Sequence, residues 1–405
     1  RHFTSRFTPV APLPAATVGL YLLLLSGLPA HLRPSPEVKR MSRAMVVLFG
    51  LQIVAGLVNL LLLAPVALQL VHLLLADAVW VVLVLTALES FAVGVEHVEK
   101  KSVAAPEPAA AMPAGALGRA TLGDYVALTK PRVISLLLFT TLAAMVISKA
   151  GWPGWRLFIM VAIGGYLAAG AANAINMVID RDIDIRMDRT AQRPTVTQKI
   201  PSRDALLFAY ALAGASFAIL WFEANLLTAM LAFAGLVCYV IVYTLYLKRR
   251  TWHNIVIGGA AGAFPPLVGC AAVTGHLDVL AWSLFGIIFL WTPVHFWALA
   301  LLLKDDYARA GVPMLPVVLG ERVTVIQIGV YTVLTAVISA VPLLTHDTGR
   351  IYLVAAVGLN ALLMLRSLQL FKRPDRPRAS SLFKFSMTYL ALLFLAMAVD
   401  RSYWM

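Results

Sequence analysis

The sequence is dominated by apolar runs that are long enough to cross a lipid bilayer. A spanning helix needs about 20 mostly apolar residues, and the chain of 405 residues offers twelve such runs, the first of them the weakest. They cover 15–31, 44–68, 70–95, 133–150, 155–179, 205–222, 225–247, 254–275, 278–303, 323–345, 350–371 and 381–400. Backbone groups in hydrocarbon must pair within their own segment, and these runs are too long and too unalternating for barrel strands. We therefore predict an all-α polytopic membrane protein.

Composition supports this class. Sixty per cent of the residues are apolar and only 13% are charged, which excludes an ordinary soluble protein. The two cysteines, Cys238 and Cys270, both lie inside apolar runs. A CxxC metal site and a disulfide framework are therefore excluded as well.

The net charge of +13 reflects where the basic residues sit. Of the 33 Lys and Arg residues, 27 fall in alternate connecting segments. These segments are 32–43, 98–132, 180–204, 248–253, 304–322 and 366–384. Such an asymmetry is typical of loops retained in the cytoplasm, so we predict that these loops and any site among them face the cytoplasm, with no nucleic-acid partner. No amphipathic Arg- and Ser-rich presequence precedes the spans, which favours a bacterial plasma membrane over a mitochondrial one.

One segment without a span divides the chain. Residues 98–123 are rich in Ala and Pro, and we predict that they link an N-terminal membrane segment, 1–97, to a larger domain, 124–405. The chain begins with Arg rather than Met, so we expect the N-terminal segment to be the remnant of something longer.

Acidic residues are scarce, yet several recur at a helical spacing. Asn176, Asp180, Asp184 and Asp188 stand four residues apart, which on an α-helix forms one stripe. Carboxylates at that pitch repel one another unless they are paired or bind a cation. Mg²⁺ takes carboxylate and amide oxygens together with substrate phosphates, so the stripe predicts a magnesium site. The alternative is a stripe paired with the interleaved arginines, Arg181, Arg186, Arg189 and Arg193, although an Arg next to an Asp points away from the shared face.

A second acidic segment follows a later span. Asp305 and Asp306 come directly after the run 278–303, and the charge pattern predicts the same membrane side as the first segment. Basic residues are available around both segments: Lys130, Arg132, Arg193, Lys248 and Arg249. Together they predict a receptor for Mg²⁺ and a phosphate ester. Taken singly, the basic residues could serve orientation alone.

Two further features predict an enclosed cavity. The run 254–275 includes Gly258, Gly259, Gly262, Pro265 and Pro266, a pattern that favours a broken helix lining a cavity. His295 stands between Trp291 and Trp297, which suits a flat aromatic ligand or an axial metal bond. A hydrogen-bonded histidine within helix packing is the alternative.

These motifs resemble those of a known family. NMVIDRDID at 176–184, with DRT at 188–190 and RP at 193–194, resembles the first aspartate motif of intramembrane aromatic prenyltransferases of the UbiA superfamily. Four longer segments resemble its haem O synthase branch: LTKPRVISLLLFTT at 128–141, YTLYLKRRTWHNIVIGGAAGAFPPLVG at 243–269, WTPVHFWALA at 291–300 and DDYARAGVPMLPVV at 305–318. The likeness extends over about 120–402.

The resemblance implies a nine-helix bundle around a central cavity, which about three extra transmembrane helices would precede here. It implies transfer of a farnesyl group from farnesyl diphosphate to a vinyl group of haem B (protohaem IX), with addition of water to give haem O, and Mg²⁺ as the ion that holds the diphosphate. The implied metal ligands are Asn176, Asp180, Asp184 and Asp306, of which the three aspartates are the catalytic candidates. The implied diphosphate contacts are Lys130, Arg193 and Lys248.

The sequence departs from the family at two places. Val294 stands where the family usually has a second proline beside His295. Arg309 and Ala310 stand where other superfamily members complete a DxxxD pair after Asp305 or Asp306. Metal binding by the second acidic segment is therefore less secure than by the first.

The N-terminal part carries a second resemblance. Residues 48–85 resemble the last two helices of haem A synthase, with His72 at the position of a haem-ligating histidine. We predict a truncated fusion partner without oxidase activity, and haem A synthase as a partner, since that enzyme would consume haem O. A plain membrane anchor is the alternative.

Two rival functions share these residues. A related prenyltransferase acting on a quinone precursor predicts the same metal site. A secondary transporter also combines acidic groups with broken helices, but it would place them near the bilayer midplane, whereas these lie at helix ends.

Overall fold

The computed structural model describes residues 36–61, scattered helical residues between 68 and 86, and residues 120–404. The chain divides into two compact units, 1–112 and 113–405, each held together by its own contacts. In the first unit, helix α2 covers Pro36–Leu61 and overlaps the second predicted span. The first predicted span lies outside the described residues, and only part of the third is described.

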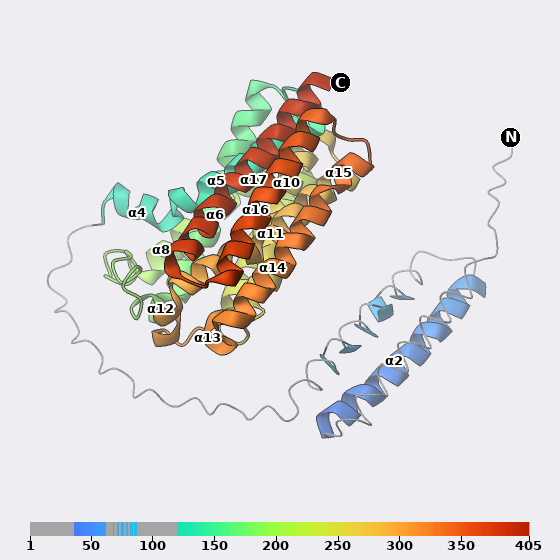
Figure 1. Cartoon of the computed structure of the whole chain (residues 1–405), viewed down its shortest axis with the longest axis horizontal. Coiled ribbons are helices and arrows are strands. Elements are labelled where there is room, and N and C mark those ends of the chain that lie inside the picture. Colours follow the sequence, from blue (N-terminus) through green and yellow to red (C-terminus); the bar gives the residue numbers. More distant parts are fainter. Residues whose placement is uncertain are drawn as a thin grey trace. The chain divides into compact units, whose positions relative to one another are not determined.

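The second unit is a bundle of membrane-length helices (Figure 1). Each of the nine runs predicted after residue 130 corresponds to one long apolar helix within the described residues, so the all-α class is confirmed. The helices are α5 (Pro131–Lys149), α6 (Trp155–Ile179), α8 (Ser202–Glu223), α9 (Leu226–Val237) with its π-helical continuation η1 (Cys238–Leu247), α10 (Asn254–Thr274), α11 (Val279–Leu302), α14 (Gly320–Ser339) with α15 (Val341–Leu344), α16 (Arg350–Lys372) and α17 (Arg376–Trp404). The chain is therefore a multi-pass membrane protein.

Helices α10 and α11 form the interior of the bundle and are its most buried spans. They pack against each other, α10 also against α5 and α9, and α11 also against α14 and α17. Small residues allow this: a Cβ on Gly269 would lie 2.1 Å from the Thr141 carbonyl oxygen, so α10 and α5 cross at backbone contact. The prediction that this span is broken is wrong, because α10 continues through Pro265 and Pro266. Close packing, rather than a break, accounts for Gly258, Gly259 and Gly269 of this helix.

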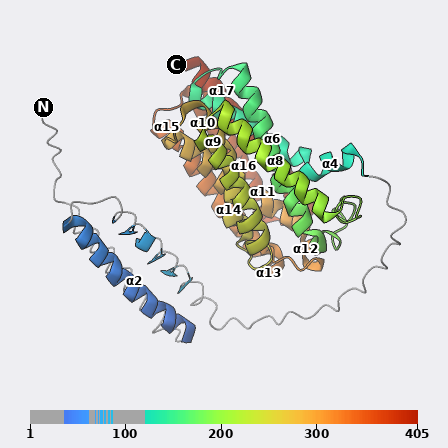
Figure 2. The same ribbon diagram turned by 180° about the vertical axis from the view of Figure 1, so that it is seen from behind.

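Four short helices belong to the connections that carry the acidic and basic segments. They are α4 (Leu122–Thr129), α7 (Arg181–Asp184), α12 (Lys304–Arg309) and α13 (Leu315–Val318). In both views α12 and α13 lie at one end of the bundle, whereas α15 and the C-terminus lie at the other (Figures 1 and 2). An ion pair between Arg309 of α12 and Asp188 brings the first acidic segment to the same end of the bundle as the second, as their charge pattern predicts.

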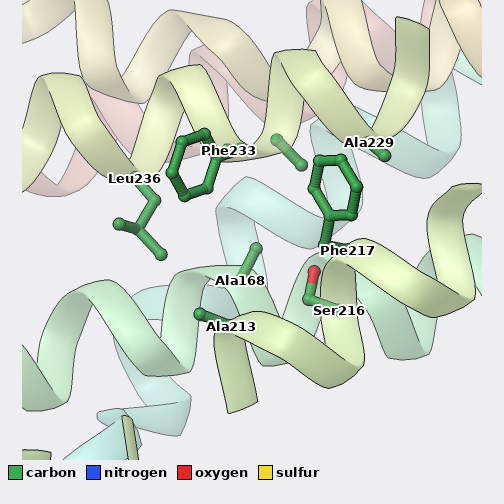
Figure 3. Close-up of a pocket in the computed structure, with 8 residues that line it drawn as sticks. Ala168, Ala213, Ser216, Phe217, Ala229, Phe233 and Leu236 are labelled. Carbon is green, nitrogen blue, oxygen red and sulfur yellow. The ribbon is translucent and has the colours of Figure 1, made fainter. Parts of the chain in front are cut away.

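A small apolar pocket lies between α6, α8 and α9 (Figure 3). Alanines, Phe217, Phe233 and Leu236 line it, with Ser216 as its polar residue. Its volume is about 10 Å³, near the lower limit for a single water molecule. It is far too small for a porphyrin and lies among residues that no sequence motif singled out.

Candidate functional site

The first acidic segment begins where α6 ends. Asp180 follows Ile179 with a backbone outside the helical range (φ −86°, ψ 6°), and the short helix α7 follows it. The Thr190 hydroxyl donates a hydrogen bond to the Asp184 carbonyl at 2.9 Å, which takes up a carbonyl at the end of that helix. The predicted stripe is therefore correct through Asp184 and wrong for Asp188, whose side chain is largely exposed away from the helix.

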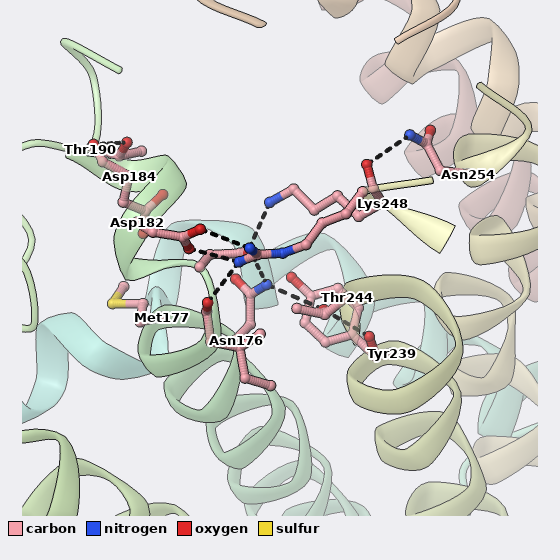
Figure 4. A network of polar contacts seen from close by, with 12 residues as sticks. Asn176, Met177, Asp182, Asp184, Thr190, Tyr239, Thr244, Lys248 and Asn254 are labelled. Atoms are coloured by element: carbon pink, nitrogen blue, oxygen red, sulfur yellow. Dashed lines mark hydrogen bonds and ion pairs between the residues drawn. The ribbon is translucent and has the colours of Figure 1, made fainter. Parts of the chain in front are cut away.

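Asp180 is fully buried and contacts Asn176 and Lys248, two residues of the polar network that Figure 4 shows. Its Oδ2 accepts hydrogen bonds from Lys248 Nζ at 2.5 Å and from Asn176 Nδ2 at 2.6 Å. Its Oδ1 is buried and has no hydrogen-bond partner among the described residues, and an Arg249 nitrogen lies 3.7 Å from it. A buried carboxylate oxygen without a partner is costly, and it is an oxygen ligand of the kind that Mg²⁺ prefers.

Lys130 completes the inner part of the network. Its Nζ donates to Asn176 Oδ1 at 2.8 Å, while the Asn176 amide nitrogen also donates to the Thr244 hydroxyl at 3.2 Å. Burial, together with the nearby charges of Arg193 and Lys248, lowers the pKa of Lys130 to about 7. The Lys130 ammonium therefore stands in a place that a bound anion would stabilise.

Asp184 lies next to this network and is also buried. Its Oδ2 accepts from Arg193 Nη1 at 2.5 Å. Arg193 is one of the four arginines interleaved with the acidic stripe, and it pairs with Asp184 of that stripe. Asp184 is therefore paired with an interleaved arginine, whereas Asp180 pairs with Lys248 and Arg249 of the distant segment after η1.

An outer ion pair fixes that distant segment. Arg249 donates to both carboxylate oxygens of Asp182 at 2.7 Å and to the Ile179 carbonyl at 2.8 Å. The Arg249 hydrogen bonds hold the pKa of Asp182 below its usual value. Because Asp182 lies off the four-residue spacing, the spacing provides no reason to select it, although it pairs with Arg249 between the two segments.

The second acidic segment joins the first through one arginine. Arg309 Nη2 contacts Asp306 in α12 and also Asp188, the latter at 2.9 Å. Asp306 is partly buried and Asp305 exposed, whereas Tyr307 is buried. The structure therefore brings the second acidic segment next to Asp188 at the far end of the first, through Arg309, and no ion pair or hydrogen bond of the described residues links Asp306 to Asp180 or Asp184 directly.

No cluster of three or more His, Cys, Asp or Glu residues suited to one metal ion occurs among the described residues. Asp180, Asp184 and Asp306 each face a basic side chain instead. The oxygens of Asp180 and the neighbouring Asn176 amide nevertheless fit a hard cation, which would replace Lys248 as the partner of Asp180.

His295 lies in the core of the bundle. Its ring stacks between Trp291 and Phe383, at centroid distances of 4.7 and 4.6 Å, and its Nδ1 lies 2.8 Å from the Ser386 hydroxyl. Trp291 Nε1 donates to the Ser386 carbonyl at 2.8 Å. These contacts tie α11 to α17 and match the packing alternative.

His72 belongs to the first unit. Its Nε2 lies 3.3 Å from Gln52 Nε2, and its ring packs where a Cβ on Gly56 would lie 3.0 Å away. Its Nδ1 is buried with no hydrogen-bond partner among the described residues. The contact joins His72 to α2 within that unit.

The sequence is similar to those of proteins whose family is known. The model of the UbiA prenyltransferase family matches residues 137–395. The chain is 61% identical over 401 residues to a protoheme IX farnesyltransferase of Thermus thermophilus, covering 99% of this chain and 65% of that protein. It is 52% identical over 295 residues to a protoheme IX farnesyltransferase of Deinococcus radiodurans, covering 70% and 94% respectively. The chain therefore spans less than two thirds of the length of the Thermus relative and nearly all of the Deinococcus one.

Solved structures share the fold at low sequence identity. A structure concerned with digeranylgeranylglyceryl phosphate synthase is 20% identical with a TM-score of 0.59, covering 69% of this chain and 98% of that one. A UbiA homologue from Aeropyrum pernix is 18% identical with a TM-score of 0.54, covering 67% and 98%. A UbiA homologue from Archaeoglobus fulgidus bound to GPP and Mg²⁺ is 17% identical with a TM-score of 0.52, covering 68% and 99%.

Proposed function

Because this chain belongs to the UbiA prenyltransferase family, we propose that it transfers a farnesyl group from farnesyl diphosphate to a vinyl group of haem B, giving haem O. The names of its relatives support haem B as the acceptor. The observation that carries the proposal is the buried Asp180 carboxylate, which has one oxygen without a hydrogen bond from the described residues and lies near Lys248, Lys130 and Asn176. Such a group suits a diphosphate that arrives with a divalent cation.

In this proposal Mg²⁺ is held by Asp180 and Asp184, with Asn176 and the more distant Asp306 as further oxygen ligands. A UbiA homologue bound to GPP and Mg²⁺ supports the choice of ion. Bound there, the ion would neutralise charge on the diphosphate. The protein's own cations add to that effect: Lys130, Arg193 and Lys248 would turn from their carboxylate and amide partners to the phosphate oxygens.

The proposed reaction conserves atoms and charge. The bond between the farnesyl C1 and the diphosphate oxygen breaks, and its electron pair leaves with the diphosphate. The terminal carbon of the haem vinyl group then bonds to C1, and water adds a hydroxyl to the other vinyl carbon while one proton passes to solvent. The buried cations stabilise the departing diphosphate, and the surrounding apolar helices limit access of stray water.

The acceptor contacts are proposed from the sequence. We propose that His295, between its two stacked rings, lies beside the flat haem, and that His72 is a haem contact of the N-terminal unit. The site would open to the cytoplasm from the plasma membrane, and haem A synthase would receive the product.

An assay of the purified full chain in lipid nanodiscs tests the function. Farnesyl diphosphate is supplied with haem B or with aromatic acids related to quinone precursors, with and without a chelator, and products are identified by mass. We expect a farnesylated, hydrated haem only without chelator. Prenylation of the acids alone would make the chain a quinone-type prenyltransferase, and solute flux without diphosphate release would make it a transporter.

A further inference from the structure

Lys130 has a backbone conformation that its neighbours disfavour. It forms the junction of α4 and α5, with φ 55° and ψ 62° in the left-handed region. A residue with a Cβ pays about 1–2 kcal/mol there, and the following Pro131 biases the preceding residue towards extended geometry instead. Other contacts must therefore hold this junction in place.

One face of α6 supplies those contacts. Asn173 Nδ2 donates to the Thr129 carbonyl, the peptide that leads into Lys130, at 2.9 Å. The Tyr166 hydroxyl lies 2.8 Å from the Thr129 hydroxyl. Gly170 lets the junction approach, because a Cβ there would lie 3.1 Å from Thr129 Cγ2. These residues follow one another at steps of three and four, which puts them on one side of the helix.

The same face continues into the polar network. Asn176, one step beyond Asn173, accepts the Lys130 ammonium at 2.8 Å. Two asparagines of α6 therefore bind the consecutive residues Thr129 and Lys130. Asn173 binds the Thr129 carbonyl, and Asn176 binds the Lys130 side chain. Asn173 is buried and does not itself contact Asp180 in the described hydrogen bonds.

We propose that Asn173 is a positioning residue that keeps Lys130 in its left-handed conformation, so that the ammonium points at the diphosphate site. The role rests on the proposed function in one respect, namely that Lys130 contacts diphosphate. Without the Asn173 hydrogen bond, the junction relaxes towards the extended geometry that Pro131 favours, and the ammonium leaves the network.

The test uses the full chain in nanodiscs and two readouts. The first is binding of inorganic pyrophosphate in the presence of Mg²⁺, measured by calorimetry. The second is the rate at which a water-soluble amine reagent labels Lys130, measured by peptide mass spectrometry. The variants are Asn173→Ala, Lys130→Met, their combination, and Asn225→Ala. Asn225 is the matched control, because its amide also donates to a carbonyl of another helix, that of Ala271 at 2.7 Å, but near the opposite end of α6 and α10.

For Asn173→Ala we expect labelling of Lys130 to rise several-fold and pyrophosphate affinity to fall about tenfold, since tenfold corresponds to about 1.4 kcal/mol and lies within the strain held at the junction. Adding Lys130→Met to this variant should weaken binding no further than Lys130→Met alone, because both changes remove the same contact. Asn225→Ala should leave both readouts unchanged.

Each result decides a separate point. Unchanged labelling of Lys130 in Asn173→Ala, or equal effects of Asn225→Ala, would overturn the positioning role whatever happens to binding. Additive losses of affinity would also contradict it. Faster labelling with unaltered pyrophosphate binding would support the positioning role and instead remove Lys130 from the proposed diphosphate contacts.

Discussion

Replacing Asp180 with Asn removes one buried negative charge and keeps the size of the side chain. In the wild-type protein that charge faces Lys248 at 2.5 Å and Arg249 at 3.7 Å. The ion pair between Asp180 and Lys248 can be interpreted in two ways. If the carboxylate serves a magnesium diphosphate, the substitution removes catalysis, whereas if it only neutralises Lys248, the substitution removes stability and little else.

The two interpretations differ in magnitude. Asn still offers an oxygen to Lys248, so the loss of stability is about 1–2 kcal/mol, the difference between a charged and a neutral hydrogen bond. That is below the cost of about 3–5 kcal/mol for deleting one member of a buried pair. Turnover should fall by about 10²–10³-fold, as when one electrostatic contact to a developing anion is lost. This corresponds to about 3–4 kcal/mol of activation free energy.

The assay measures kcat with farnesyl diphosphate and haem B, together with thermal unfolding of the same protein in nanodiscs. Asp182→Asn is the matched control, because Asp182 lies two residues away and has a side chain that is 58% exposed. An exposed ion pair contributes about 1 kcal/mol or less, so its turnover should stay within a few-fold of wild type. The decisive variant combines Asp180→Asn with Lys248→Met. Recovery of turnover in that double variant would refute the catalytic interpretation, since only a purely structural pair can be deleted as a unit.

Two other perturbations test the charge and the packing. The pKa of Lys130 lies at about 7, so its charge is present below that pH and lost above it. Calorimetry should show Mg²⁺-pyrophosphate affinity falling as pH rises through 7, and Lys130→Met should flatten this profile relative to wild type in the same buffers. The unfolded chain binds this proton up to about pH 10.4, so the wild type should also gain stability as pH rises between these values, a gain absent from Lys130→Met. Gly269→Ala places a Cβ 2.1 Å from the Thr141 carbonyl oxygen and should cost about 1–3 kcal/mol in thermal unfolding. Gly262→Ala in the same helix, with nothing within 4 Å, should instead be neutral or stabilising by up to about 1 kcal/mol, and an equal loss would contradict the packing argument.

The spans could be predicted from sequence because hydrophobic length is a local property. The helix α6 begins at Trp155 and ends at Ile179, as the apolar run predicts, since the acidic segment follows it directly. The side of the membrane shared by the two acidic segments was also predictable, because alternate basic loops fix it. Neither inference requires knowledge of which helices touch.

The partners within the site could not be predicted in the same way. Lys248 reaches Asp180 from the end of η1, where π-helical hydrogen bonding, such as Lys248 N to the Tyr243 carbonyl at 2.8 Å, alters the angular position of the side chain relative to an α-helix. Asn173 was missed because its role depends on the neighbouring α4–α5 junction. The spacing wrongly puts Asp188 on the helical stripe, because it does not reveal that the Thr190 hydroxyl donates a hydrogen bond to the Asp184 carbonyl at the end of the helix.

The charges within the site indicate why a diphosphate and a divalent ion should arrive together. Lys130, Arg193 and Lys248 provide three cations against the two carboxylates of Asp180 and Asp184, which leaves one excess positive charge when Lys130 is protonated. A diphosphate ester carries several negative charges, so these residues alone cannot neutralise it in a buried site, where unpaired charge is costly. A divalent ion on the free Asp180 oxygen makes up the difference and also releases Lys248 for the phosphate. In the proposed assay, a chelator should therefore abolish binding of the diphosphate as well as its reaction.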